Sequence, residues 1–251
     1  MKDIAAKVTA NEKLYDGAYL LTLASAEDIP ECAAGQFAMV EVPLGDRILR
    51  RPFGIVEAGG NTCTFLYQVK GAGTEALSGL RYGDGVRVTL PLGNGFPTFS
   101  GKVAVVGGGF GVAPLLSAAR ACKAAGAEVR IYNGFATAER IMLTGLFAEA
   151  GKLTVCTDDG STGFRGFPTA ALEADIAAGW TPDVILCCGP SPLMRVVKKL
   201  GEERGIVTYL SLEQRMGCGI GACLTCTCKV AGHNKRVCKD GPVFISTEVQ
   251  P

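Results

Sequence analysis

The sequence has very little histidine and almost no net charge, and both shortages narrow the range of functions. His233 is the only histidine among 251 residues, and the formal net charge is +1. A balance so close to zero leaves no electrostatic footprint for nucleic acid or for an anionic membrane surface. One histidine in a glycine-containing loop, without a paired Cys or Ser site, also gives no base assembly. We therefore predict no catalytic acid–base residue in this chain and no nucleic-acid partner.

Long apolar runs are also missing. No stretch approaches the roughly 18–20 apolar residues that a membrane-spanning helix needs. Residues 1–13 lack the apolar core of a signal peptide. These two features predict a cytoplasmic protein that does not cross a membrane.

Cysteine, in contrast, is abundant for that compartment. The chain has 11 cysteines, and disulfides are disfavoured in the cytoplasm, where clustered cysteines more often bind metal or react. Five of the 11 fall between positions 218 and 238, and the others are scattered. Scattered cysteines usually pack as small apolar residues. The distribution predicts a metal site near the end of the sequence.

The first region of the chain, residues 1–100, has the pattern of short strands. Segments such as 62–70 and 85–93 are rich in β-branched and aromatic residues and lie between glycine-containing turns. A short helix is possible near 73–79. Closely spaced short strands of this kind favour a small antiparallel β-barrel.

The second region, residues 101–210, alternates between strand-like and helical segments. The run 103–106 is continuously apolar, as expected of a buried parallel strand, and a helix is predicted over 112–125. The alternation continues through a predicted helix over 138–150 and ends with a strand over 205–210. Five βα-like units in succession predict a doubly wound α/β domain.

The third region, residues 211–251, shows neither period. It is rich in glycine and cysteine and too short for an apolar core of its own, so it needs a metal to hold its shape. The sequence thus predicts three domains, with boundaries at 1–100, 101–210 and 211–251.

Four cysteines of the third region have the spacing of an iron–sulfur site. Cys218, Cys223 and Cys226 follow the pattern C-x4-C-x2-C, and Cys238 follows after 11 further residues. The spacing matches the plant-type [2Fe–2S] pattern, whereas structural zinc sites usually have paired C-x2-C units. We predict that these four thiolates hold a [2Fe–2S] cluster, and that Cys228 packs beside the cluster without binding it.

A second candidate site combines an arginine with a glycine-rich turn. The segment Arg51–Gly54 begins a predicted strand, and residues 68–70 lead into the turn Gly71–Thr74. A guanidinium pairs with phosphate in bidentate fashion, and the N-terminus of a short helix supplies N–H groups. We predict a pyrophosphate site here, for which Arg50 competes with Arg51.

Two turns of the second region point to a nucleotide. The turn 107–114 directly follows the strand 103–106, and its glycines allow a close approach of the backbone to a pyrophosphate, although the spacing is not G-x-G-x-x-G. The turn 188–190 reads C-G-P at the end of a later strand. No clear pocket for a 2′-phosphate is present, with Arg140 as the nearest candidate, so we favour NAD over NADP.

Together, the R-P-F-G and G-x-G-T motifs, both glycine turns and the terminal cysteines resemble the ferredoxin-reductase-like flavoproteins. More closely, they resemble the electron-transfer subunits of NAD-dependent (type B) dihydroorotate dehydrogenases, over essentially the whole chain. The resemblance implies FAD, a [2Fe–2S] cluster and NAD as cofactors, and Gly54 stands where the family motif commonly has Ser or Thr. The implied FAD contacts are Arg51, Pro52, Phe53, Gly54, Gln68, Val69, Lys70, Gly73 and Thr74. The implied nucleotide contacts are Gly107, Gly108, Gly109, Gly111, Cys188 and Gly189.

The resemblance also implies a role and a partner. It implies that electrons pass from an FMN-containing dihydroorotate dehydrogenase subunit through the cluster and FAD to NAD⁺ in pyrimidine (UMP) biosynthesis, within a heterotetramer of two copies of each subunit. The missing base assembly agrees with a substrate site on that partner. Two alternatives stay open. One is the small subunit of an NADH-dependent ferredoxin:NADP⁺ oxidoreductase, whose cluster typically has an aspartate in place of one cysteine. The other is a flavin and iron–sulfur redox sensor, which would lack NADH-dependent turnover.

Overall fold

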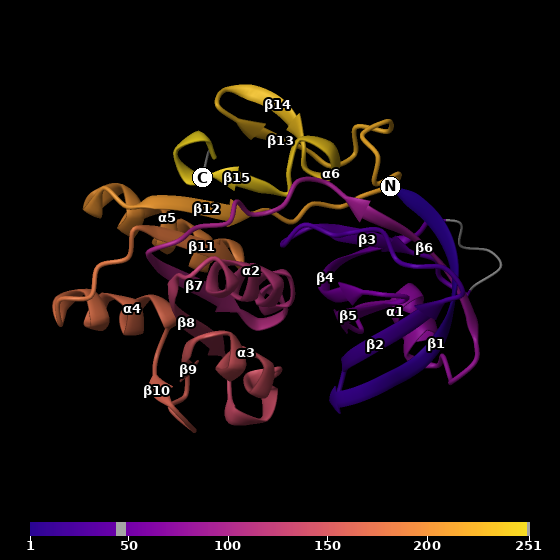
Figure 1. Cartoon of the computed structure of the whole chain (residues 1–251), viewed down its shortest axis with the longest axis horizontal. Helices are drawn as coiled ribbons and strands as arrows, with labels where there is room; N and C mark the ends of the chain where they lie inside the picture. Colours follow the sequence, from indigo (N-terminus) through magenta and orange to yellow (C-terminus); the bar gives the residue numbers. More distant parts are fainter. Residues whose placement is uncertain (44–48, 250–251) are drawn as a thin grey trace. The chain divides into compact units, whose positions relative to one another are not determined.

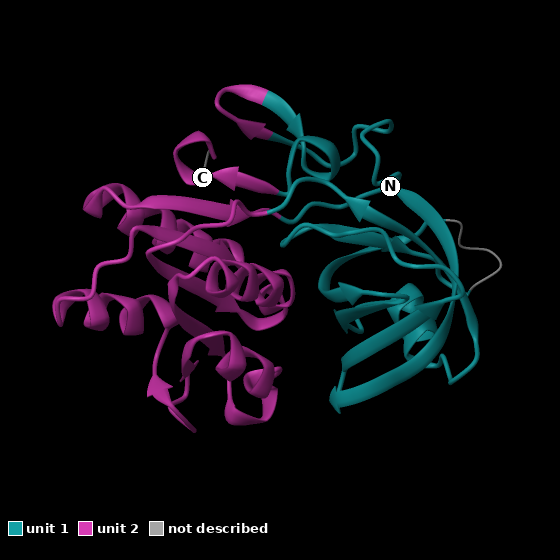
Figure 2. Cartoon of the chain, viewed as in Figure 1, with its two compact units in different colours: residues 1–95, 213–228, 234–242 teal, residues 96–212, 229–233, 243–251 magenta. Residues whose placement is uncertain are grey.

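The computed structural model describes residues 1–43 and 49–249, so the last two residues of the predicted third domain lie outside the described residues. The chain divides into two compact units (Figure 2). Unit 1 consists of residues 1–95, 213–228 and 234–242, and unit 2 consists of residues 96–212, 229–233 and 243–251. Segments of the cysteine-rich region therefore pack with both units.

Unit 1 is built around a closed antiparallel barrel with the strand order β1-β2-β5-β4-β3-β6 (Figure 1). Its elements are β1 (Lys2–Tyr15), β2 (Ala18–Ser25), β3 (Phe37–Val40), β4 (Arg51–Gly59), β5 (Thr62–Gln68), α1 (Ala72–Ser78) and β6 (Gly85–Leu92). Buried and more exposed residues alternate along β6 and the first half of β1, because successive side chains of a strand point to opposite faces. The predicted antiparallel barrel is confirmed.

Large apolar side chains fill the barrel and hold α1 in place. Leu21, Phe65 and Tyr67 are almost completely buried, and the Tyr67 hydroxyl donates a hydrogen bond to Asn11 Oδ1 at 3.1 Å. The amide of Asn11 in turn donates to the carbonyl of Leu77 in α1 at 2.9 Å. Helix α1 is therefore fixed on the barrel by the burial of Leu77 and by a polar anchor.

Unit 2 contains a seven-stranded sheet in the order β10-β9-β8-β7-β11-β12-β15. Its strands are β7 (Lys102–Gly108), β8 (Glu128–Phe135), β9 (Lys152–Thr157), β10 (Phe164–Arg165), β11 (Val184–Cys188), β12 (Val207–Ser211) and β15 (Val243–Ile245). Neighbouring strands are parallel except for the pair β12–β15. The central strands β7 and β11 are almost entirely buried, as expected of a sheet covered on both faces. The predicted doubly wound domain is confirmed.

The helices of unit 2 follow the predicted alternation, with one interruption. They are η1 (Gly109–Val112), α2 (Ala113–Ala124), η2 (Ala138–Arg140), α3 (Thr144–Ala150), α4 (Pro168–Ala177), α5 (Ser191–Arg204) and η3 (Ser246–Glu248). The single helix predicted over 138–150 is wrong, because Leu143 has a φ of 59° and a left-handed residue cannot continue a right-handed helix. Among the described residues, no helix is both long and apolar enough to cross a membrane.

The cysteine-rich region has little regular structure of its own. It forms the hairpin of β13 (Thr227–Val230) and β14 (His233–Arg236) and the short helix α6 (Val237–Asp240). Its last part returns to the sheet of unit 2 as β15, and Lys198 of α5 donates to the carbonyl groups of Ser246 and Val249 at 2.7 Å each. The sequence did not predict this edge strand, because three residues are too few to show a period.

Candidate functional site

Arg51 and the turn that opens α1 meet in unit 1. Arg51 is the first residue of β4, and Gly73 lies in the first turn of α1. A Cβ atom at Gly73 would lie 2.6 Å from Nη2 of Arg51 and 2.8 Å from its Nε, so the guanidinium rests directly on this turn. The first N–H groups of a helix have no partner within the helix. The arrangement therefore presents a cation and N–H donors together, as a pyrophosphate requires.

The neighbouring Arg50 takes part in a different cluster. Its guanidinium forms an ion pair with Asp3 and donates to the hydroxyl of Thr89. Arg87 also pairs with Asp3, at 2.6 Å between Nη2 and Oδ2. These partners, Arg50 above all, hold the pKa of Asp3 well below its usual range. The Arg50 side chain is thus held by Asp3 of β1 and Thr89 of β6. Of the two competing arginines, only Arg51 lies at the turn of α1.

Other residues predicted for the flavin shape this turn. The hydroxyl of Thr74 accepts a hydrogen bond from the N–H of Lys70 at 2.8 Å and donates to the carbonyl of Gly71 at 3.0 Å. Gln68 ends β5, and Val69 packs against the apolar core of the barrel. The Thr74 hydroxyl therefore holds the turn and occupies the N–H groups of Lys70 and Gly71. The donors for a ligand would be the first N–H groups of α1.

The two faces of β4 have different tasks. Phe53 faces the interior of the barrel, where its ring centroid lies 5.5 Å from that of Tyr67. Pro52 and Gly54 lie on the opposite face, because side chains alternate along a strand. On that face Pro52 is in register with Met39 of β3. A flavin bound at this motif would therefore contact the backbone of Phe53, because the side-chain ring of Phe53 packs in the barrel core.

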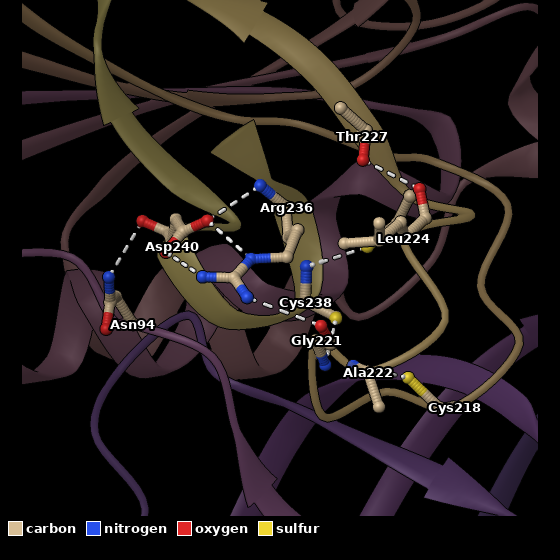
Figure 3. A network of polar contacts seen from close by, with 10 residues as sticks. Asn94, Cys218, Gly221, Ala222, Leu224, Thr227, Arg236, Cys238 and Asp240 are labelled. Atoms are coloured by element: carbon tan, nitrogen blue, oxygen red, sulfur yellow. Dashed lines mark hydrogen bonds and ion pairs between the residues drawn. The ribbon is translucent and has the colours of Figure 1, made fainter. Parts of the chain in front are cut away.

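The loop that carries three of the four cysteines, residues 217–226 and here named the cysteine loop, turns its backbone toward sulfur (Figure 3). The N–H of Gly221 donates to Cys238 Sγ at 3.1 Å, and the N–H of Cys238 donates to Cys226 Sγ at 3.4 Å. Cys218 Sγ accepts from three further N–H groups of the loop at 3.3–3.4 Å. Hydrogen bonds to sulfur favour the thiolate form and are one of the factors that set the potential of an iron–sulfur cluster. The donor set and its hydrogen bonds fit a cluster held by cysteine.

The four thiols form two pairs. The N–H of Cys223 donates to Cys218 Sγ and the N–H of Cys238 donates to Cys226 Sγ, each at 3.4 Å. Cys223 is exposed, whereas the second pair is buried. Within the described residues no group of three or more His, Cys, Asp or Glu side chains is arranged to hold one metal ion. Two separate pairs agree instead with two irons that have two ligands each.

Cys223 and Cys238 differ in their proton affinity. Hydrogen bonds from Thr225, followed by those from Cys218, lower the pKa of Cys223 to about 6. Burial raises the pKa of Cys238 to about 12. Metal coordination deprotonates a thiol outright, so Cys238 has to release its proton when iron binds. Cys228 lies in β13 outside both pairs, and burial raises its pKa as well.

The cysteine loop rests on the strands of the barrel. Gly219 is buried, and a Cβ atom there would lie 2.5 Å from Cγ of Met39 and 3.2 Å from Cδ1 of Leu92. Met39 belongs to β3 and is the register partner of Pro52. The loop therefore packs against the strand that lies beside the Arg51–Gly54 motif. Sequence patterns did not indicate Met39, because only barrel closure brings β3 against a loop so distant in the chain.

In unit 2 the two predicted nucleotide motifs lie together at the carboxyl ends of neighbouring strands. β7 and β11 are neighbours, although β8, β9 and β10 intervene in the sequence, so the strand order reverses between them. Gly107 at the end of β7 is in register with Cys188 at the end of β11. Doubly wound sheets bind ligands beyond the carboxyl ends of the strands at this switch point.

The glycines of the 107–111 turn serve two different purposes. A Cβ atom at Gly111 would lie 2.5 Å from Cα of Gly189 and 2.6 Å from the carbonyl of Cys188, so this glycine allows the turn to pack against the end of β11. Gly108 allows a similarly close approach to α5, since a Cβ there would lie 2.7 Å from Cδ2 of Leu193. Gly109 has a φ of +52°, and a Cβ there would meet nothing within 4 Å. Gly109 is therefore the position where the backbone is open to a ligand.

Asn133 lies at the same end of the sheet, and the sequence patterns did not indicate it. It lies on β8 in register with Gly107 and is completely buried. Within the described residues neither polar atom of its side chain has a hydrogen-bond partner. A Cβ atom at Gly107 would lie 2.7 Å from Oδ1 of Asn133, so the Asn133 amide packs directly against the backbone of Gly107. An isolated asparagine in a strand carries no local signal that would have identified it.

Comparison with known proteins adds a family to this geometry. The model of the iron-sulfur cluster binding domain of dihydroorotate dehydrogenase B matches residues 213–250. The dihydroorotate dehydrogenase B (NAD(+)) electron transfer subunit of Clostridium acetobutylicum is 40% identical over 245 residues, which cover 97% of this chain and 95% of that protein. The chain belongs to the family of dihydroorotate dehydrogenase B electron transfer subunits. The subunit of the same name from Caldanaerobacter subterraneus subsp. tengcongensis is 37% identical, with 97% of both chains covered.

Solved structures agree with the fold. The NADH-dependent reduced ferredoxin-NADP oxidoreductase superposes with a TM-score of 0.90 at 28% identity, over 98% of this chain and 89% of that chain. Phthalate dioxygenase reductase superposes with a TM-score of 0.64 at 23% identity, over 80% of this chain and 64% of that chain, and shares the fold. The predicted fold class of this dihydroorotate dehydrogenase B family member, with a barrel domain, a doubly wound domain and a small iron–sulfur region, is confirmed.

Proposed function

We propose that this protein is the electron-transfer subunit of an NAD-dependent dihydroorotate dehydrogenase. Electrons from a partner subunit with FMN would pass through a [2Fe–2S] cluster and FAD to NAD⁺, in the pathway to pyrimidine nucleotides. Family membership at 40% identity over 97% of the chain supports this role. The relatives carry the words electron transfer subunit in their names, which supports a separate catalytic partner.

One observation of the structure carries the proposal. Inside unit 1, the cysteine loop packs on Met39, and Met39 is the register partner of Pro52 in the Arg51–Gly54 motif. The candidate cluster ligands and the candidate flavin motif are thus neighbours within one compact unit. Electron transfer needs such proximity, and an independent metal site elsewhere on the chain would not.

The residues have distinct tasks in this proposal. Arg51 and the N–H groups of the α1 turn would hold the pyrophosphate of FAD, and the cysteine pairs would hold the two irons. The turn at Gly109 and the end of β11 at Cys188 would hold NAD. A bound flavin exchanges either two electrons or one, and so connects a hydride carrier to a one-electron cluster. The functional domains would follow the boundaries predicted from the sequence.

The partner supplies what this chain lacks. Removal of a carbon-bound proton from dihydroorotate requires a base, and the sequence offers a single histidine, which is exposed in the β13–β14 hairpin. The substrate site would therefore lie on the FMN subunit, in a heterotetramer with two copies of each subunit. We place this complex in the cytoplasm.

Co-expression with the FMN subunit tests the proposal. We expect a stable complex that reduces NAD⁺ when dihydroorotate is added, measured as NADH absorbance. In the matched complex with Cys238→Ala, dihydroorotate should still reduce a dye at the partner, while NAD⁺ reduction is lost. A protein that contains FAD and cluster but forms no such complex would contradict the dihydroorotate assignment and leave the electron-transfer role standing.

A second candidate is favoured by the TM-score of 0.90 to the NADH-dependent reduced ferredoxin-NADP oxidoreductase. The two functions differ in their electron partners. NADH-dependent reduction of ferredoxin without any response to dihydroorotate would favour this alternative. A redox sensor would show neither reaction, and an assay of NADH oxidation with artificial acceptors separates it from both.

A further inference from the structure

Arg236 lies against the cysteine loop and is not one of its ligands. Its Nη1 donates to the carbonyl of Gly221 at 3.3 Å, and the N–H of the same Gly221 donates to Cys238 Sγ (Figure 3). A Cβ atom at Gly221 would lie 3.5 Å from Nη1 of Arg236, and the glycine has a φ of +83°. The chain thus passes directly between a guanidinium and a candidate ligand sulfur.

Asp240 holds this guanidinium in one orientation. Its carboxylate accepts from Arg236 Nε at 3.1 Å, from Nη2 at 3.2 Å and from the backbone N–H of Arg236 at 2.8 Å. Such a two-pronged pair fixes the plane of the guanidinium as well as its position. Both side chains are about a quarter to a third exposed, so water screens the pair only in part.

Asn94 ties the same pair to the barrel. Its amide donates to the carbonyl of Asp240 at 2.9 Å (Figure 3). Asn94 itself lies just beyond the end of β6 and forms an isolated β-bridge with Pro242. The sequence of contacts therefore runs from the barrel through Asp240 and Arg236 to Gly221. The guanidinium has a fixed place relative to the buried cysteine pair.

Arg236 lies close to the buried cysteine pair. One residue, Gly221, separates its guanidinium from Cys238 Sγ, because the Gly221 carbonyl accepts from Nη1 at 3.3 Å and the Gly221 N–H donates to the sulfur at 3.1 Å. A cluster held by four thiolates is anionic, and each electron that enters adds one negative charge. A nearby cation stabilises the reduced form more than the oxidised form. Lys239 also packs its methylene groups over Gly221, but this residue is exposed, so water screens its charge more strongly.

We propose that Arg236 is a positioning residue that, oriented by Asp240, raises the reduction potential of the cluster and fixes the Gly221 segment against it. The proposal rests on the proposed function, since it needs a [2Fe–2S] cluster at the four cysteines. The two electrons of each oxidised dihydroorotate would pass this point one at a time and end on NAD⁺. No bond or proton changes at Arg236, whose charge only sets how favourable each one-electron step is.

Substitutions at the two partners should shift the potential in opposite directions. Arg236→Gln removes the cation, and we expect the midpoint potential of the cluster to fall. Arg236→Lys keeps the positive charge, so the midpoint potential of this variant should lie close to that of the wild type. Asp240→Asn removes the anion that partly cancels the cation, and the potential should rise. The measurement is a redox titration of the purified FAD-containing protein, followed by the electron paramagnetic resonance signal of the reduced cluster.

Two controls separate charge from structure. Lys13→Gln removes a cation from an exposed ion pair with Asp16 in the β1–β2 turn of the same unit, and it should leave the potential unchanged. Asn94→Ala removes the anchor of Asp240 without changing any charge, and it should speed cluster loss more than it shifts the potential. If Arg236→Gln does not retain a cluster, a potential that rises in Asp240→Asn and stays near the wild-type value in Arg236→Lys still decides the question.

Each outcome distinguishes this inference from the function on which it rests. Wild-type protein without iron, sulfide and the absorbance of a [2Fe–2S] cluster would contradict the proposed function itself. Wild-type protein with a cluster, whose potential is unchanged by Arg236→Gln and Asp240→Asn, would overturn only the role of Arg236. Shifts of the same sign in both variants would also overturn it, because loosening of the loop exposes the cluster alike in both.

Discussion

Cys223 of the cysteine loop and the cysteines of the unit 2 sheet lie in opposite environments. Cys223 is exposed and accepts hydrogen bonds, chiefly from Thr225, and its pKa falls to about 6. Cys156 and Cys187 are buried within β9 and β11, and burial raises the pKa of Cys156 to about 11 and that of Cys187 well above its ordinary value. The same side chain is therefore prepared for metal in one region and serves as an apolar core residue in the other.

The difference lies in the backbone. In the cysteine loop the chain curls so that N–H groups point at sulfur, whereas in the sheet the N–H groups are used by neighbouring strands. Hydrogen bonds to a thiolate favour the charged form, and burial without them favours the neutral form. Cysteine content alone does not separate the two regions, but local loop geometry does.

The largest expected effect tests this difference directly. Cys238→Ala should abolish the visible iron–sulfur absorbance and the bound iron, because an iron loses one of its ligands. Cys187→Ala should keep the full cluster and cost about 1 kcal/mol of folding stability. Absorbance spectra, iron analysis and urea unfolding measure both effects.

Cys228→Ala provides the close control for that experiment. It removes a thiol two residues from Cys226, and we expect the cluster spectrum to remain. Loss of the cluster in Cys228→Ala, or its survival in Cys238→Ala, would show that the ligand set has been assigned wrongly.

The next effect concerns FAD. Arg51→Gln should weaken FAD binding by about 1.5–3 kcal/mol, roughly 10- to 100-fold, because a hydrogen bond to a charged group is lost. Gly73→Ala should act in the same direction, since its Cβ would displace the guanidinium. FAD content and fluorescence titration of the apoprotein measure the change.

A matched substitution sharpens this FAD prediction. Arg50→Gln removes the neighbouring guanidinium, which pairs with Asp3 and not with the α1 turn. This protein should bind FAD almost as well as the wild type. Equal losses for Arg50→Gln and Arg51→Gln would mean that the Arg51 cradle is not the pyrophosphate site.

The nucleotide turn gives an effect of similar or smaller size. Gly111→Ala forces a Cβ into the end of β11, and overpacking of this kind costs about 1–3 kcal/mol, so folding stability and NADH affinity should fall together. Gly109→Ala adds a Cβ on the open side and should lower NADH affinity with a smaller loss of stability. Thermal unfolding and NADH titration separate the two patterns, and identical behaviour would contradict the two purposes assigned to these glycines.

The smallest expected effect concerns folding stability and the carboxylate of Asp3, whose surroundings, like those of the cysteines, shift its pKa. The Arg50 guanidinium, with Arg87 and Thr89, depresses the pKa of Asp3 from its usual 3.8. A depressed pKa stabilises the folded state above the unfolded pKa, and this stabilisation is lost as pH falls through the folded value. Because Asp3 is more than a third exposed, the contribution should not exceed about 1 kcal/mol.

Asp3→Asn measures this contribution. At pH 7 the variant should be slightly less stable than the wild type in urea unfolding. The difference should shrink as the pH is lowered below about 4, where the carboxyl of the unfolded chain becomes protonated. A difference that grows at low pH would reverse the sign of the linkage and refute the role given to the arginines.

The sequence by itself determined the three kinds of region and the identity of the candidate ligands. The spacing of Cys218, Cys223 and Cys226 is a local property that a short loop must satisfy, so it can be read from the chain. The change from strand-like to alternating pattern near position 101 is equally local, because it reflects the period of side chains along each element.

Only the tertiary structure decided which residues face one another. It placed Arg51 on Gly73 and Arg50 on Asp3, brought Met39 beneath the cysteine loop, and gave Gly109 and Gly111 different surroundings. It also set Arg236 between Asp240 and Gly221. Contacts of this kind depend on barrel closure and strand order, which join residues far apart in the chain and leave no trace in local spacing.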